Sequence, residues 1–287
     1  MDSFWMFGFL YMAFGIFLPP AYIRIIYIFL SRKKHRQLQC YRVMAQIGIV
    51  QLAAAPGSFA CGLINILGYD PHGILTLFVL LFSSSVAMEI FLSLVLALNR
   101  LEVITKIKCR GIVHKVVYFI TYLYGFAYCV LCLSPLCGYI VTPGHFLGSY
   151  DFAKPYSAAF AKVNSYVLTS VSSITLLVYV VIIVFLTWRR TRASSSKQRE
   201  MHILAYAGIR FFVDFGLSIF FFFTPITPSW YSELLTGSAY ILNSLLISPL
   251  LYLSLTRSIR LEFMDFLHFA QRTTSVSTIG QSSRGPQ

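Results

Sequence analysis

The sequence predicts an all-α membrane protein whose chain crosses the bilayer seven times. Three observations lead to this fold class. Of the 287 residues, 57% are hydrophobic and only 11% are charged, whereas soluble domains carry about 25% charged residues. Seven apolar stretches approach the roughly 20 residues that a helix needs to cross a hydrocarbon core ~30 Å thick. Basic residues gather in alternate connections between these stretches.

The seven stretches are expected to be helices, because lipid offers no partners for unpaired backbone N–H and C=O groups. The alternating pattern typical of a membrane β-barrel does not occur in this sequence. The Pro19-Pro20 pair, Pro56 and Pro249 are expected to kink the first, second and seventh helices. The expected spans cover residues 4–30, 43–67, 74–97, 116–140, 166–188, 203–224 and 234–255.

The uneven distribution of positive charge indicates how the chain is oriented. Most of the 23 Lys and Arg residues lie in four segments, and the opposite connections hold only Lys154 and Lys162. This asymmetry predicts an N-terminus outside, a C-terminus in the cytoplasm and basic segments beside anionic membrane lipid. The formal net charge of +13 therefore does not call for a nucleic-acid partner. The basic segments are 32–42, 100–115, 189–199 and 257–284.

One transmembrane domain is expected over residues 1–270, with a disordered cytoplasmic tail over 271–287. Before the tail, "RSIRLEFMDFLHF" (257–269) predicts an amphipathic helix along the inner interface, with apolar residues on one face. That face holds Ile259, Phe263, Phe266 and Leu267. The aromatic connection 141–165 is long enough to fold over the outer mouth of the bundle.

The six cysteines do not have the spacing of a metal site, so neither a metal nor a cofactor is expected. Cys40 and Cys109 lie on the cytoplasmic side, where thiols stay reduced. Cys61 and Cys137 both approach the outer side, and whether they form a disulfide depends on their geometry.

Ionisable residues inside the spans point most strongly to function. Each costs about 2.5–3.5 kcal/mol to insert, and such residues usually face the bundle interior. Arg210 and Asp214, spaced i, i+4, share one helix face. We expect a buried polar layer that links spans two, three, six and seven. It contains Gln51, Glu89, Arg210, Asp214, Asn243 and Ser248.

Two alternatives to this layer remain open. Arg210 and Asp214 can satisfy each other locally beside a neutral Glu89, or Glu89 can hold a sodium ion or a proton. Glu89, Arg210 and Asp214 also motivate a second function, that of a small-solute or proton-coupled transporter. An enzyme is not expected, because neither His-Glu-x-x-His nor Gly-x-Ser-x-Gly occurs.

The order of these features resembles a G-protein-coupled receptor with the rhodopsin-like layout. In "ALNRLEV", Asn99-Arg100 ends the third span, where that family has an acidic residue followed by arginine. In "SPLLY", Pro249 and Tyr252 resemble the Pro-x-x-Tyr of its seventh span, and Tyr179 resembles its inner tyrosine in span five.

Departures from that pattern narrow the resemblance. Span six lacks Cys-Trp-x-Pro, and no cysteine occurs in 141–165 or near His72 to form the family's usual disulfide. The stretches "LPPAYIRIIYIFL", "CYRVMAQIGIVQ" and "LALNR" resemble the nematode serpentine chemoreceptors of the Srt and Srx type. The resemblance covers about residues 8–270.

This resemblance implies a chemosensory receptor in the plasma membrane of sensory cells, where it binds an external small molecule and activates a heterotrimeric G protein. Arg100 is expected to pair with Glu200 in the inactive state, and Tyr179 and Tyr252 to brace the active one. The implied switch residues are Asn99, Arg100, Glu200, Tyr179, Pro249 and Tyr252.

The ligand is expected in the outer half of the bundle, among spans three, five, six and seven. An aromatic lining with few polar groups suits a small, fairly apolar molecule. The candidate ligand-binding residues are Phe78, Phe82, Ser85, Tyr166, Ser170, Phe221, Phe222 and Tyr240.

Overall fold

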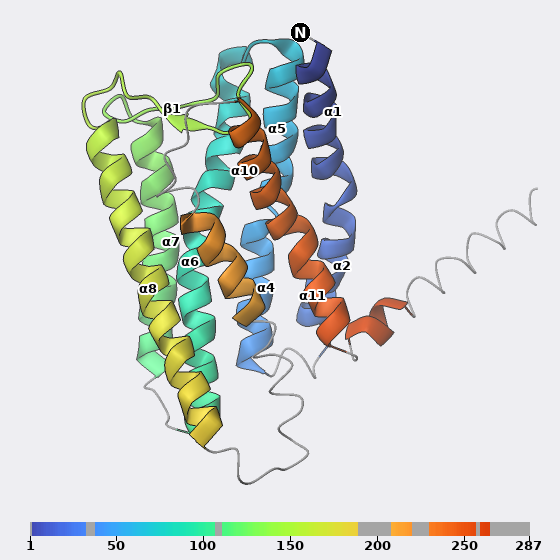
Figure 1. The fold of residues 1–287 in the computed structure, drawn as a ribbon, viewed down its shortest axis with the longest axis vertical. Helices are drawn as coiled ribbons and strands as arrows, with labels where there is room; N and C mark the ends of the chain where they lie inside the picture. Colours follow the sequence, from blue (N-terminus) through green and yellow to red (C-terminus); the bar gives the residue numbers. More distant parts are fainter. Residues whose placement is uncertain are drawn as a thin grey trace, which may run out of the picture.

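A computed structural model describes residues 2–32, 38–106, 111–188, 208–219, 230–256 and 259–264. Long helices stand side by side in one bundle, and a small two-stranded sheet lies at the end where α1 begins (Figure 1). We call this the amino-terminal end. Six helical segments in the described ranges are long and apolar enough to cross a membrane. Residues 208–219, also helical, lie within the expected sixth span.

The helices follow the expected spans with shifted boundaries. The third helix continues past Arg100 to Thr105, and the fourth ends at Leu133 instead of Ile140. In chain order the elements are α1 (Asp2–Phe17), α2 (Pro19–Ser31), α4 (Gln39–Gln51), α5 (Ala54–Leu67), η1 (Pro71–Gly73), α6 (Ile74–Thr105), α7 (Gly111–Leu133), β1 (Tyr139–Ile140), β2 (Ser149–Tyr150), α8 (Ser157–Trp188), the helical stretch 208–219, α10 (Trp230–Leu242), η2 (Asn243–Ile247), α11 (Ser248–Leu255) and a short helix over 259–264.

Each expected proline interruption is confirmed. Proline has no N–H and its ring collides with the carbonyl four residues earlier, so the α-helical hydrogen-bond ladder breaks there. The chain breaks at Leu18 between α1 and α2, just before Pro19. It breaks again between α4 and α5, where the Ala55 N–H, next to Pro56, donates to the Leu52 carbonyl at 3.1 Å. The π-helical turn η2 ends immediately before Ser248 and Pro249.

Helix α6 is the central element, in contact with α4, α5, α7 and α8. The approach of α5 to α6 is close enough to require glycine: a Cβ on Gly57 would lie 2.5 Å from the Phe82 Cβ. On the other side of the bundle, α7 and α8 present large apolar side chains outward, with Phe126 69% and Leu177 64% exposed. These surfaces are the ones that contact lipid in a membrane-spanning bundle.

After α11, residues 259–264 form the beginning of the expected amphipathic helix. Ile259 is fully buried. Glu262 forms an ion pair with Arg32, with Oε2 3.2 Å from Nε. The expected apolar residues Phe266 and Leu267 lie outside the described residues.

Candidate functional site

The structure brings five of the six residues expected in the buried polar layer into one hydrogen-bonded set. Gln51 of α4 donates from Nε2 to Glu89 Oε1 of α6 at 2.7 Å. Arg210 pairs with the same Glu89 oxygen through Nη2. Gln51, Glu89 and Arg210 are each at most 5% exposed. Tyr22 of α2, which the sequence did not single out, donates its hydroxyl to Gln51 and extends the layer to a fourth helix.

The layer continues from Arg210 to the seventh span. Arg210 donates from Nε to Asp214 Oδ2 at 3.2 Å and from Nη1 to the Asn243 carbonyl at 3.0 Å. The Asn243 side-chain amide donates to the other Asp214 oxygen. Because π-helical η2 starts at Asn243, the local backbone deviates from the α-helical ladder where Arg210 binds it. Ser248 is fully buried, but its Oγ has no hydrogen-bond partner among the described residues and does not join the set.

The expected switch residues lie towards the opposite end of the bundle. Asn99 and Arg100 are both 3% exposed on α6, so Arg100 lies inside the bundle and not at a helix end in water. Tyr179 is buried against Phe211, with ring centroids 5.2 Å apart. Fully buried Tyr252 packs on Phe29 and Tyr22. Glu200 lies outside the described residues.

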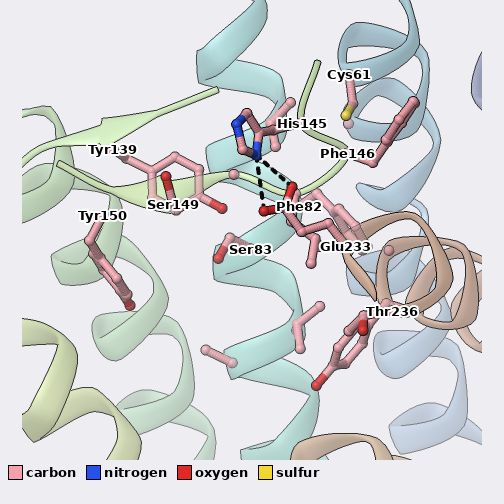
Figure 2. A pocket seen from close by; sticks show the side chains of 18 of the residues that line it. Cys61, Phe82, Ser83, Tyr139, His145, Phe146, Ser149, Tyr150, Glu233 and Thr236 are labelled. Atoms are coloured by element: carbon pink, nitrogen blue, oxygen red, sulfur yellow. Dashed lines mark hydrogen bonds and ion pairs between the residues drawn. The ribbon is translucent and has the colours of Figure 1, made fainter. Parts of the chain in front are cut away.

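A cavity of about 460 Å³ occupies the amino-terminal half of the bundle. Its walls come from α5, α6, α7, α8 and α10, and the segment around β1 and β2 covers it (Figure 2). Its size lies within the range of small-molecule sites, about 300–1,000 Å³. The apolar part of the lining includes Val79, Phe82, Ile90, Phe146 and Leu168.

The connection expected to fold over the bundle mouth does so, and Asn65 of α5 fixes it. The Asn65 amide donates to the His145 carbonyl at 2.9 Å and accepts from the Gly144 N–H at 2.8 Å. Gly144 has φ +90°, a conformation that only glycine adopts readily. Phe146 is buried next to this clamp, 5.3 Å from the Tyr11 ring. We call residues 138–152 the lid.

A second tie joins the lid to α10. His145 Nδ1 lies 3.0 and 2.9 Å from the two carboxylate oxygens of Glu233 (Figure 2). The His145 side chain is 46% exposed and that of Glu233 is 19% exposed. Because solvent screens exposed pairs, this contact contributes less than the buried clamp of Asn65.

Hydroxyl groups form a continuous chain along one wall of the cavity. Tyr124 donates to Asn164 Oδ1 at 2.6 Å, and Asn164 Nδ2 donates to the Tyr150 hydroxyl at 3.1 Å. The Tyr128 hydroxyl lies 3.0 Å from that of Tyr150 and 3.0 Å from Ser83 Oγ. We call Ser83, Tyr128, Tyr150 and Asn164 the hydroxyl chain.

Of the expected ligand-binding residues that the structure describes, Phe82 and Tyr240 line the cavity and the others do not. Tyr166 is 72% exposed and Phe78 37% exposed, Ser170 is also exposed, and Ser85 donates to the Phe82 carbonyl within its own helix. Phe221 and Phe222 lie outside the described residues. The sequence did not single out the hydroxyl chain or Glu233, which also line the cavity.

Nothing in the described ranges has the composition of a metal site: no cluster of three or more His, Cys, Asp or Glu residues occurs there. Five cysteines are described, and all are free thiols. Cys61 and Cys137 are among them, so the disulfide considered between them does not form.

Comparison with known proteins identifies the family. The sequence profile of the family "Serpentine type 7TM GPCR chemoreceptor Srt" matches residues 2–276. Among solved structures, squid rhodopsin matches with a TM-score of 0.73 and 11% sequence identity, covering 94% of this chain and 86% of that chain. No curated protein matches the sequence.

An identity of 11% indicates a shared fold and nothing more, and that fold confirms the expected rhodopsin-like bundle of seven transmembrane helices. The family profile carries the stronger conclusion, because it spans nearly the whole sequence. The chain belongs to the serpentine type of seven-transmembrane G-protein-coupled chemoreceptors, family Srt.

Proposed function

We propose that this protein binds an external small molecule in the cavity under the lid and activates a heterotrimeric G protein at the opposite end of the bundle. The observation that carries this proposal is the position of the polar layer, directly next to the cavity. Cavity-lining Ile90 follows Glu89 in α6, and cavity-lining Ile241 is two residues before Asn243. A ligand in the cavity therefore lies within one helical turn of a buried ion pair between two helices.

The mechanism follows from the strength of that ion pair. Interrupting a buried pair leaves an uncompensated charge and costs about 3–5 kcal/mol, so the helices that carry Glu89 and Arg210 prefer discrete arrangements. Ser218 lines the cavity and lies on the same helix as Arg210 and Asp214. A ligand that contacts this helix shifts the equilibrium to the extent that its affinity differs between arrangements.

The end of the bundle opposite the cavity would face the cytoplasm and the G protein. The basic segments support a cytoplasmic location for that end, where they face anionic lipid of the plasma membrane of a sensory cell. Buried Arg100 lies there on α6, the helix that also supplies Phe82 and Ile90 to the cavity. Outward movement of the helix containing 208–219 would expose Arg100 to the G protein, while Tyr179 and Tyr252 would brace the open arrangement.

Nothing specific favours the transporter alternative. Glu89, Arg210 and Asp214 direct their charged groups to one another and to Gln51 and Asn243. A closed set of this kind fits a structural switch better than a site that must exchange an ion with water.

A ligand screen in cells with a second-messenger readout tests the proposal. We expect at least one small apolar compound to raise the messenger in cells that express the receptor. Arg100→Ala is expected to lose most of this response at an equal surface level. An epitope tag at residue 1, stained on unpermeabilised cells, measures that level and the predicted external N-terminus. A response that Arg100→Ala leaves intact would contradict the assigned mechanism.

A further inference from the structure

Among the described residues around the cavity, no charged group is free to bind a charged ligand. Within the described lining, Glu233 is the carboxylate, and both of its oxygens face Nδ1 of His145. No lysine or arginine belongs to that lining. Nearby Lys154 directs its Nζ to the carbonyls of Ser134 and Cys137, at 3.3 and 3.1 Å. A cationic ligand would have to displace His145, and an anionic ligand would find no arginine or lysine partner.

The hydroxyl chain has one more hydroxyl proton than it has hydrogen bonds between hydroxyl groups. Ser83, Tyr128 and Tyr150 contribute three hydroxyl protons, and two hydrogen bonds join the three oxygens. Asn164 donates into the chain at Tyr150, and its own acceptor oxygen is taken by Tyr124. Whichever way the protons are ordered, one O–H remains without an acceptor inside the chain.

The two serines that follow Ser83 on α6 differ from it, because each donates its hydroxyl proton to a backbone carbonyl. Ser84 donates to the Gly125 carbonyl at 3.0 Å, and Ser85 donates to the Phe82 carbonyl at 2.7 Å. Ser83 lines the cavity and makes its bond to Tyr128 instead. Tyr139 of β1 is hydrogen-bonded to Ser83 at this end of the chain. It adds one hydroxyl proton and one hydrogen bond, so one O–H still has no acceptor, and Figure 2 shows both hydroxyls at the cavity.

The phenols supplied by the lid keep their protons at neutral pH. Burial raises the pKa of Tyr139 and of Tyr150, and the hydrogen bond with Ser83 offsets only part of the rise at Tyr139. The surplus donor is therefore present throughout the physiological pH range.

We propose that the cavity takes an uncharged, largely apolar molecule that carries a carbonyl oxygen, as in a ketone, and that the surplus O–H where Ser83 meets Tyr139 binds this oxygen. A carbonyl supplies the missing acceptor and brings no further donor that would need a partner. A hydrocarbon fills the apolar wall but leaves the O–H unpaired, which costs binding energy in a buried site. This inference rests on the proposed role of the cavity as the receptor's ligand site.

The test uses the full-length receptor in lipid nanodiscs and measures binding directly, as a probe-dependent rise in the melting temperature. The probes are 2-undecanone, undecane, 2-aminoundecane and undecanoate, with a rigid second series of benzophenone, diphenylmethane, diphenylmethylamine and diphenylacetate. The ketone of at least one series is expected to bind tightest. Ser83→Ala is expected to weaken ketone binding about tenfold, the effect of losing one hydrogen bond in a buried site. Binding of the matched hydrocarbon should not change.

Ser85→Ala is the matched control, because Ser85 neighbours Ser83 on α6 but bonds only within its own helix. Tyr128→Phe, which interrupts the hydroxyl chain at its middle, is a second variant if Ser83→Ala does not fold. The assignment is overturned if an amine or carboxylate binds as well as its ketone, if no ketone binds, or if Ser83→Ala and Ser85→Ala behave alike. Ketone binding without a cellular response would instead count against the proposed function, since this readout does not involve a G protein.

Discussion

Arg100 is a buried arginine with unsatisfied hydrogen-bonding groups. Its Nε and Nη2 atoms have no hydrogen-bond partner within the described part of the chain, and neither has the Oδ1 atom of neighbouring Asn99. Burying polar groups without partners is unfavourable, so the arrangement around Arg100 is less stable than one with a carboxylate beside it. This residue is the place where a single substitution is expected to change the balance between receptor states.

Asn99→Asp is expected to lower ligand-free signalling roughly fivefold, at the lower end of typical coupling energies. The added carboxylate pairs with Arg100 and holds it in the bundle. The second-messenger level in cells without ligand, compared at equal surface expression, measures this change in basal signalling. Asn99→Gln, which keeps the amide, is the control and should leave basal signalling close to wild type. Basal signalling that does not fall in Asn99→Asp would contradict this role of the asparagine.

The buried ion pair between Glu89 and Arg210 is expected to stabilise the folded receptor. Glu89→Gln and Arg210→Gln are each expected to destabilise the receptor by about 3–5 kcal/mol, because each leaves a buried charge less compensated. The double variant should be more stable than the sum of the two effects implies, with a coupling of roughly 0.5–3 kcal/mol.

Thermal denaturation of the purified wild type, the two single variants and the double variant measures these stability differences. Glu89→Gln combined with Ser254→Ala is the control, since the Ser254 side chain is exposed and its hydroxyl donates to the Leu251 carbonyl of its own helix. Simple additivity for Glu89 and Arg210 would mean that they do not interact in the folded receptor.

The residues of the polar layer and of the cavity differ in how far sequence could predict them. Glu89 and Arg210 stand out because charged groups are rare in apolar spans and turn towards the bundle interior. Tyr166 and Ser170 do not carry such a signal. Whether an aromatic or hydroxyl residue of a membrane helix faces lipid or a cavity depends on helix rotation, and the structure turns both of these residues outward.

At the scale of elements, the lid depends on one side chain of a distant helix. Asn65 on α5 holds the backbone of Gly144 and His145, about eighty residues later in the chain. Removing the side chain leaves two partly buried backbone groups without partners, each of which costs about 1–3 kcal/mol. The lid should then open more often.

Asn65→Ala is accordingly expected to speed ligand dissociation about tenfold or more, with a smaller effect on association. Displacement of a bound ligand from the purified receptor measures the rate. His145→Ala removes the exposed tie to Glu233 and leaves the Asn65 clamp in place, so it should change dissociation less than fivefold, because exposed ion pairs contribute about 0.2–1 kcal/mol. Equal effects of the two substitutions would show that the Asn65 clamp does not hold the lid.

Element boundaries show why apolar character alone misplaces helix ends. The apolar run after Leu133 predicts a fourth span that continues to Ile140, yet the helix ends there and residues Tyr139–Ile140 form β1. Pro135 cannot donate to the helical ladder, and Tyr139 and Ile140 pair with β2 instead of continuing the helix. The third helix extends to Thr105 because burial inside the bundle accommodates Asn99 and Arg100 within it.

For the whole molecule, composition was enough to predict the bundle. A backbone in lipid has to form its hydrogen bonds internally, so apolar stretches of sufficient length have few alternatives to helix. The spacing of the apolar stretches along the sequence does not determine which helices contact one another. The central position of α6 and the cavity beside it depend on how the side chains pack in three dimensions. The account of function depends on that packing, because α6 connects the cavity, the polar layer and Arg100.

Energetic coupling between the two ends of the bundle is the central claim, and coupling of this kind must be reciprocal. Ligand affinity of the receptor in nanodiscs, with and without nucleotide-free heterotrimeric G protein, measures it most directly. We predict that the G protein tightens ligand binding by roughly 5–150-fold, and that Arg100→Ala removes this gain but leaves the affinity of the receptor alone unchanged. A ligand that binds in the cavity with the same affinity whether or not the G protein is present would contradict it.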